Sequence, residues 1–295
     1  AEDTLCGEWP RRLGSAMTFR DTAAPPVIVV EPPRGWARIG WADLWAHREL
    51  AWMLMLRNIQ TRYKQAVLGG LWAILQPAFT ALVLAVVFSS TFRDSIHGTP
   101  YLLFVYTGTL PWLLLSSIVG NAAVHVVDNA HILTKVYFPR LLIPLAVTGY
   151  AVLDFVVGFV ILVVLMIGFG VHLGLTVLFV PLVVVAILAA AIGVGVMLSA
   201  LTARYRDFRF VVQFLLQLWF FASPVIYPPS ILPRSVQSLM ILNPMAGLIS
   251  AFRHVLLGTP LEGWPVAVAA MFSVGLLLLG LVYFRQVEHN IADVV

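Results

Sequence analysis

Long apolar segments recur along the chain and are separated by short polar or proline-containing stretches. A helix needs about 20 apolar residues to cross about 30 Å of hydrocarbon, and these segments approach or exceed that length. They lack the strict alternation of barrel strands, so they predict helices, which satisfy their own backbone hydrogen bonds. We therefore expect six transmembrane helices, over residues 68–88, 101–127, 141–170, 175–201, 210–226 and 264–284.

A further segment, residues 41–64, is apolar along only one side of a helix. The stripe consists of Trp45, Trp52, Leu56, Ile59 and Tyr63. Most of the basic residues fall elsewhere around the helix, which predicts an amphipathic helix lying in the cytoplasmic interface. Such a helix serves either as a membrane anchor or in coupling to a partner, and the pattern favours neither.

Residues 227–258 combine apolar stretches with several prolines, which makes them too broken to cross a membrane in one helix. They are also too apolar for an ordinary exposed loop. We expect short re-entrant helices on the outer side, between the fifth and sixth spans. The alternative is a loop that rests on the outer surface.

Composition and charge agree with a membrane protein of defined orientation. Hydrophobic residues make up 60% of the 295 positions and charged residues 11%, against about 25% charged in soluble domains. With both termini in the cytoplasm, only Arg93, Arg234 and Arg253 of the 18 Lys and Arg residues lie outside, which leaves 15 inside. This bias follows the positive-inside rule and predicts that orientation.

The chain is expected to have three parts. Residues 1–40 are polar and rich in Pro and Arg, which is typical of a flexible tail, here cytoplasmic. Residues 41–64 form the interface helix, and residues 65–295 the transmembrane domain. Cys6 is the only cysteine, so no disulfide can form within the chain.

Motifs for chemistry are absent from the sequence. No phosphate-binding G-x-x-x-x-G-K-[ST] loop, zinc-binding H-E-x-x-H or nucleophile G-x-S-x-G occurs. The seven histidines are scattered, and no carboxylate pair accompanies His125 and His131 at ligand spacing. We therefore expect no catalytic residue, no metal site and no cofactor in this chain, and we do not expect an enzyme.

Asp154 is the only acid deep within a predicted span. A charge at that depth costs about 2.5–3.5 kcal/mol, so the side chain must face protein or water, or be protonated. One interpretation is a polar contact in a transport path. The other is a hydrogen-bonded pin between helices.

Aromatic residues are frequent within and near the predicted spans, and ring faces can stack on the C–H faces of sugars. Packing in the core or against lipid explains any single ring equally well. The candidate substrate path consists of Trp72, Phe79, Phe104, Asp154, Trp219, Phe220 and Tyr227.

Several stretches between residues 41 and 295 together resemble one family. They are RYKQ at 62–65 with LWAILQP at 71–77, LTKVYFPR at 133–140, RYRD at 204–207, ASPVIY at 222–227 with LNP at 242–244 and FR at 252–253, and FR at 284–285. In combination they resemble the permease subunit of the O-antigen polysaccharide ATP-binding-cassette exporters, within the type-two exporter family. The first forty residues have no counterpart in this resemblance.

The resemblance implies a homodimer in the bacterial inner membrane, paired with two copies of a cytoplasmic ATPase that binds ATP and Mg²⁺. It implies a glycan linked to undecaprenyl pyrophosphate as substrate, contact with membrane lipid and no nucleic acid. It also implies a coupling segment at residues 128–140 and an outer gate. The expected gate residues are Ser223, Pro224, Asn243 and Pro244.

Residues expected to couple this chain to the ATPase come from the same segment and from the interface helix. They are Asn129, Ile132, Lys135, Tyr137, Phe138, Arg140, Arg57, Arg62 and Lys64. The cations among them suit charge-assisted contacts with a partner or with lipid phosphates, or else only set the topology.

Three other functions remain open at this stage. A type-two exporter of drugs or small lipids would have the same topology. An intramembrane enzyme acting on lipid-linked sugars would need a polar catalytic cluster near a membrane face, and the sequence contains none. A passive channel would move its substrate without ATP.

Overall fold

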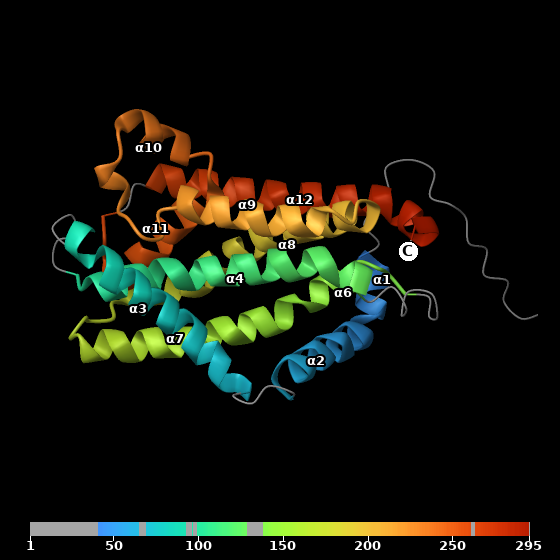
Figure 1. Cartoon of the computed structure of the whole chain (residues 1–295), viewed down its shortest axis with the longest axis horizontal. Coiled ribbons are helices and arrows are strands. Elements are labelled where there is room, and N and C mark those ends of the chain that lie inside the picture. The colour runs from blue at the N-terminus through green and yellow to red at the C-terminus, as the bar shows by residue number, and fades with distance from the viewer. Residues whose placement is uncertain are drawn as a thin grey trace, which may run out of the picture. The chain divides into compact units, whose positions relative to one another are not determined.

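The computed structural model describes residues 41–64, 69–92, 96, 99–128, 138–260 and 263–294, and in these ranges every regular element is helical. The expected tail at 1–40 lies outside the described residues. In chain order (Figure 1) the elements are α1 (Trp41–Ala46), α2 (Arg48–Lys64), η1 (Gly69–Leu71), α3 (Trp72–Phe92), α4 (Tyr101–Asp128), α6 (Leu142–Ala146), α7 (Thr148–Gly168), η3 (Leu175–Phe179), α8 (Val180–Arg204), α9 (Phe208–Ala222), η4 (Pro229–Ile231), α10 (Arg234–Met240), α11 (Pro244–Leu257) and α12 (Gly263–Val294).

Five helical segments among the described residues are long and apolar enough to cross a membrane. They are Gly69–Phe92, Tyr101–Asp128, Leu142–Gly168, Leu175–Arg204 and Gly263–Glu288. These confirm five of the six predicted spans, because long uninterrupted apolar runs leave the backbone no better arrangement in lipid than a helix.

The remaining predicted span corresponds to α9, which has 15 residues and is shorter than a full span. At 1.5 Å per residue it is about 22 Å long. It ends four residues before the predicted boundary at Ile226, because Pro224 has no amide hydrogen to continue the helix. The following residues 223–226 are nonetheless buried.

The segment after α9 contains two helices, α10 and α11, that bend by 93° at the break between them. Asn243 starts α11 by accepting a hydrogen bond from the Met245 amide at 3.0 Å. Gly258, with φ of 65°, ends it in the left-handed conformation that suits glycine. The bend agrees with either a re-entrant pair or one broken span, by length and composition alone.

Helix α4 lies at the centre of the packing and is the most buried of the five spans. Helix α8 packs along α4 on one side and α12 on another. The contact between α8 and α12 depends on two glycines, since a Cβ at Gly280 would overlap the backbone of Gly193, and a Cβ at Gly193 the backbone of Leu276. The two backbones therefore approach as closely as small residues allow.

This close approach predicts different effects of substitution at two glycines on α12. Gly280→Ala should lower stability by about 1–3 kcal/mol, because the added methyl group meets backbone rather than a movable side chain. Gly275→Ala is the matched control, since a Cβ there meets nothing within 4 Å. Thermal unfolding of the purified protein measures both. Equal melting temperatures for the two variants would contradict the crossing.

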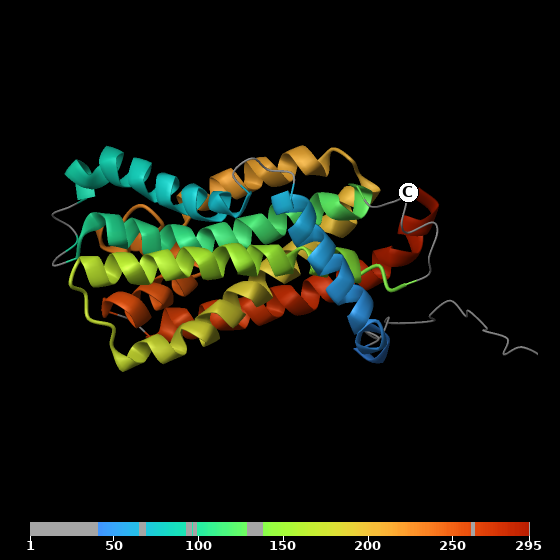
Figure 2. The same ribbon diagram turned by 90° about the horizontal axis from the view of Figure 1, so that it is seen from below.

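Helix α2 runs across the long helices rather than along them (Figure 2). For this reason its predicted apolar stripe is divided: Trp52 and Leu56 are exposed, whereas Tyr63 reaches α7. Leu50 and Leu54, from the opposite side of α2, pack instead against a buried cluster that includes residues of α6. The helix thus offers one apolar surface to the protein and leaves another uncovered.

Candidate functional site

A cavity of about 730 Å³ lies among α3, α4, α7 and α9, with the last turn of α2 at its side. Its lining combines aromatic rings with polar side chains that are unusual at membrane depth. The rings belong to Trp112, Phe155, Phe220 and Phe221, and the polar groups to Arg62, Gln76, Ser116, Ser117, Asn121, Asp154, Gln213 and Gln217.

The aromatic part of the lining is rigidly packed. Trp112, buried in α4, meets Phe220 of α9 at 5.6 Å between ring centroids and Trp219 edge-on at 5.9 Å. Phe220 and Phe221 meet at 5.4 Å. Tilted and edge-to-face pairs of this kind are favourable and fix the rings against one another.

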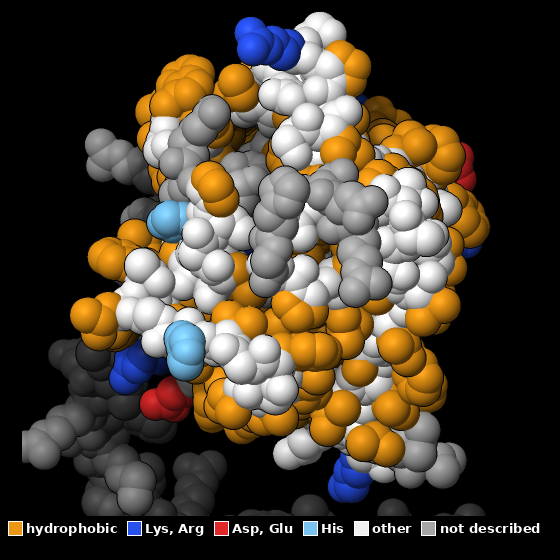
Figure 3. Space-filling model, turned by 90° about the vertical axis from the view of Figure 1, so that its left-hand side faces the viewer, with side chains coloured by type: hydrophobic (Ala, Val, Ile, Leu, Met, Phe, Trp, Pro, Cys, Tyr) orange, Lys and Arg blue, Asp and Glu red, His pale blue; other side chains and the backbone are white. Residues whose placement is uncertain are grey.

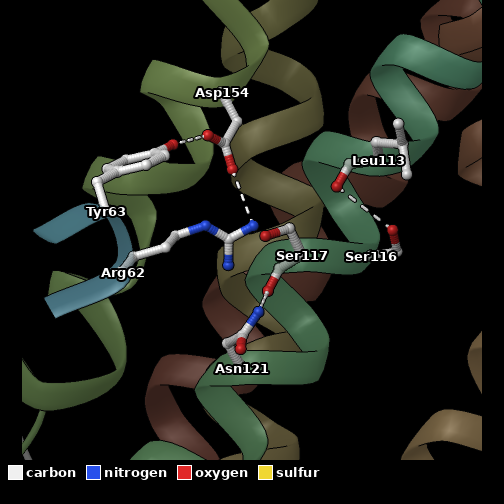
Figure 4. Close-up of polar contacts among 7 residues, drawn as sticks. All are labelled: Arg62, Tyr63, Leu113, Ser116, Ser117, Asn121 and Asp154. Atoms are coloured by element: carbon white, nitrogen blue, oxygen red, sulfur yellow. Dashed lines mark hydrogen bonds and ion pairs between the residues drawn. The ribbon is translucent and has the colours of Figure 1, made fainter. Parts of the chain in front are cut away.

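The charged part of the lining is an ion pair between α2 and α7 (Figure 4). A guanidinium nitrogen of Arg62 lies 3.1 Å from Asp154 Oδ2, and the Tyr63 hydroxyl donates to Oδ1 of the same carboxylate. The Arg62 guanidinium also lies over the Tyr150 ring, 4.8 Å from its centroid. Asp154 therefore both borders the cavity and pins α2 to α7.

Burial, and then the neighbouring Asp154 carboxylate, raise the pKa of Tyr63 to about 12. Because the folded-state pKa lies above the ordinary value of 10, the stabilising contribution of this phenol to the free energy of unfolding is complete below about pH 10. The contribution is lost only as the pH rises through about 12. Tyr63 therefore remains a hydrogen-bond donor to Asp154 throughout the pH range of an ordinary transport assay.

A second polar cluster lies at the end of α9 and centres on Asn243. Its Oδ1 accepts from Trp219 Nε1 at 2.8 Å and from the Met245 amide, while its Nδ2 donates to Ala222 O at 3.1 Å and Ser223 Oγ at 3.0 Å. All four bonds of the carboxamide are made. The cluster joins the end of α9 to the start of α11.

Arg253 of α11 lies beside this cluster and is only 3% exposed. Its guanidinium donates to the carbonyl oxygens of Pro224 at 2.6 Å, Val225 at 2.7 Å and Phe104 at 3.1 Å. It also lies over the Phe104 ring, 3.6 Å from the centroid. Carbonyl dipoles and a ring face, rather than a carboxylate, thus stabilise this cation and link α4, α11 and the turn after α9.

The predicted path residues are divided among several places. Asp154 and Phe220 line the cavity. Trp219 does not line it but packs edge-on against Trp112, which does. Phe104 lies instead against Arg253, and the Tyr227 hydroxyl donates to Phe221 O at 3.0 Å. Trp72 and Phe79 are exposed on α3.

The sequence-based prediction missed the carboxamides Gln76, Gln213 and Gln217, the ring of Phe221, and Arg253 as a buried residue. Gln213 and Gln217 carried a signal, since polar residues four apart in an apolar segment share one face of a helix. Arg253 carried none, because its acceptors are backbone carbonyls of distant segments.

The predicted gate residues lie together. Ser223 bonds to Asn243, the Pro224 carbonyl accepts from Arg253, and Pro244 occupies the first turn of α11. Among the described residues, no three His, Cys, Asp or Glu side chains lie together in a group that could hold a metal ion.

Four of the predicted coupling residues, Asn129, Ile132, Lys135 and Tyr137, lie outside the described residues. Phe138 is buried. Arg140 donates to the Glu288 carbonyl oxygen at 2.6 Å, and its backbone amide donates to Glu288 Oε1 at 3.2 Å. Of the predicted residues on α2, Arg57 and Lys64 are exposed, and Arg62 pairs with Asp154.

Comparison with known proteins gives consistent matches over this architecture. The family model for the ABC-2 type transporter matches residues 49–257. The O-antigen export system permease protein RfbA of Myxococcus xanthus is 33% identical over 254 residues, covering 85% of this chain and 97% of the relative. A protein of the same name from Klebsiella pneumoniae is 26% identical, over 81% of this chain and 92% of the relative. The polysialic acid transport protein KpsM of Escherichia coli is 24% identical, over 80% and 92% respectively.

Proposed function

The chain belongs to the ABC-2 type transporter family, and we propose that it is the permease subunit of an ATP-driven exporter of undecaprenyl-linked polysaccharide. The observation that carries this proposal is the cavity at membrane depth. It presents carboxamides and packed aromatic rings, in a chain that matches an O-antigen export permease over 85% of its length. Rings that stack on sugars and amides that bond to hydroxyl groups are the contacts that a glycan needs.

The proposed assembly is a homodimer in the bacterial inner membrane with two copies of a cytoplasmic ATPase, which bind ATP and Mg²⁺. Its support is the surface of α3 and α9 that no other described element covers: Phe79, Val83, Phe214 and Leu218 are all exposed. These two helices also form one wall of the cavity. A second copy against them would complete the path from two equal halves.

We place both termini in the cytoplasm. Figure 3 looks onto the end of the protein where α10 and α11 lie, and few charged side chains are visible there. Arg140, Arg204 and Arg285 lie near the opposite ends of the spans, where the positive-inside rule requires them. In this orientation α9 is the fifth of six spans, and residues 223–226 complete its crossing to the outer side.

Two contacts suit the transmission of work from the ATPase. The first joins Arg140, at the end of the coupling segment, to Glu288 of α12. The second joins Arg62 of the interface helix to Asp154 beside the cavity. Movement of the ATPases against residues 128–140 and α2 would therefore reach the helices that form the path, as rigid elements transmit motion. The glycan would pass over the rings, held weakly enough to be released again.

Charge reversal tests the first contact. Lys135→Glu combined with Arg140→Glu should lower ATP-driven transport about tenfold, within the range of common coupling free energies, because a carboxylate at position 140 would replace the guanidinium that donates to the Glu288 carbonyl oxygen. Assembly with the ATPase and its hydrolysis should remain measurable. Arg234→Glu on α10 is the control for a reversed charge at the other end. Unchanged transport in the double variant would contradict the coupling role.

Co-purification tests the function itself. The permease should retain an ATPase subunit in detergent, and lipid-linked glycan should stimulate its hydrolysis in proteoliposomes and cross the bilayer only with ATP. ATP-driven efflux of drugs without movement of glycan would favour a small-molecule exporter. Glycan flux without ATP would indicate a channel, and turnover of lipid-linked sugar without the ATPase would indicate an enzyme.

A further inference from the structure

Three glutamines line the cavity: Gln76 from α3, and Gln213 and Gln217 from α9. All three side chains are exposed, and the structure assigns them no hydrogen-bond partner among the described residues. Gln213 and Gln217 are four residues apart, so they lie on the same face of α9. Asn121, in contrast, donates to the Ser117 carbonyl oxygen at 2.7 Å.

An unpaired carboxamide is unfavourable at membrane depth, where neither lipid nor an apolar wall can replace water. The three amides therefore need a polar occupant of the cavity. Each carboxamide offers two donors and an acceptor with two lone pairs. A group that both donates and accepts, such as a hydroxyl group, satisfies it more completely than a carboxylate, which only accepts.

The charges of the lining agree with such an occupant. Among the described residues that line the cavity, Arg62 and Asp154 are the only charged ones, and they neutralise each other at 3.1 Å. The lining therefore has no excess of cations to replace the hydration of a polyanion. A symmetric second copy would add the same neutral set, so it would not change this balance.

We propose that this path selects an uncharged, hydroxyl-rich polymer over a polyanion, and that Gln76, Gln213 and Gln217 contact its hydroxyl groups. The inference rests on the proposed function in taking the cavity as the glycan path. It goes beyond that function by naming the class of glycan. Polysialic acid is a polyanion, so the expected substrate differs from the one in the name of the 24% identical relative.

The test uses the full-length permease in lipid nanodiscs and two soluble probes, an octamer of mannose and an octamer of sialic acid. Saturation-transfer NMR should detect the mannose octamer on the wild-type protein and not the sialic acid octamer. Gln213→Leu with Gln217→Leu should reduce the mannose signal about fivefold, the effect of losing roughly one net hydrogen bond. Gln60→Leu, an exposed glutamine of α2 outside the cavity, should leave it unchanged.

A gain of binding completes the test. Gln213→Lys with Gln217→Lys should create binding of the sialic acid octamer, because the cavity then carries a net positive charge. Equal binding of both octamers by the wild type would overturn the inference, as would binding of neither. The proposed function would survive both results if ATP still drove lipid-linked glycan across proteoliposomes, and it fails only if that transport is absent.

Discussion

Arg253→Leu should give the largest loss of stability of the single substitutions considered. It removes the shared donor of three buried carbonyl oxygens, those of Phe104, Pro224 and Val225. The Phe104 oxygen keeps the Thr107 hydroxyl as a donor, whereas leucine leaves the Pro224 and Val225 oxygens without one. At about 1–3 kcal/mol for each unsatisfied buried group, the cost is roughly 2–6 kcal/mol. For a chain of this size that corresponds to a melting temperature lower by roughly 4 °C or more.

Thermal unfolding followed by size-exclusion chromatography would measure this loss. Arg253→Lys should fall between the leucine variant and the wild type, because an ammonium keeps the charge but lacks the planar fork that reaches three carbonyls. Arg234→Leu, at an exposed position of α10, is the control. A melting temperature for Arg253→Leu equal to that of the control would show that the buried cation does not hold α11 to α4.

Asp154→Ala should give the largest loss of coupled transport among the single substitutions to alanine. It removes the partner of Arg62 and the acceptor of Tyr63, and so releases the last turn of α2 from α7. We expect ATP-driven glycan transport to fall about tenfold while hydrolysis by the ATPase continues, since a coupling contact has been lost. The effect on stability should be about 1 kcal/mol or less, because the pair is partly exposed.

A charge swap distinguishes the loss of the Arg62–Asp154 ion pair from a general effect of substitution on transport. Arg62→Asp and Asp154→Arg should each impair transport. The double variant should recover much of it, because positions 62 and 154 again carry charges of opposite sign. Glu49→Ala removes a carboxylate from the same helix away from the cavity and should have no effect. Full transport by Asp154→Ala would show that the contact serves only to anchor α2.

The sequence was most informative about the spans. Long apolar runs have one favourable backbone arrangement in lipid, so five spans could be predicted to within a few residues. The end of the short helix α9 was harder to predict, because the apolar run continues beyond it to Ile226. The helix ends where it does because of Pro224 and of the turn whose carbonyl oxygens accept from Arg253. Hydropathy averages over such a break and does not locate it.

The site was less predictable, because its contacts join segments far apart in the chain. Asp154 stood out as an acid within a span, yet its partners, Arg62 and Tyr63, belong to a helix that crosses α7. Arg253 was placed on the outer side by the topology alone, and its burial could not be predicted because its acceptors are backbone carbonyls of distant segments. Of the aromatic residues predicted for the path, Phe220 lines the cavity, whereas Trp72 and Phe79 are exposed on α3 and would need a second copy to line a path.

The central claim is that the cavity among α3, α4, α7 and α9 carries the glycan. A photocrosslinking amino acid at Phe220, in the cavity, should capture lipid-linked glycan in proteoliposomes only while the partner ATPase hydrolyses ATP. The same amino acid at Leu278, exposed on α12, should capture none. Equal capture at both positions, or capture at Leu278 alone, would place the polymer outside this cavity and contradict the account.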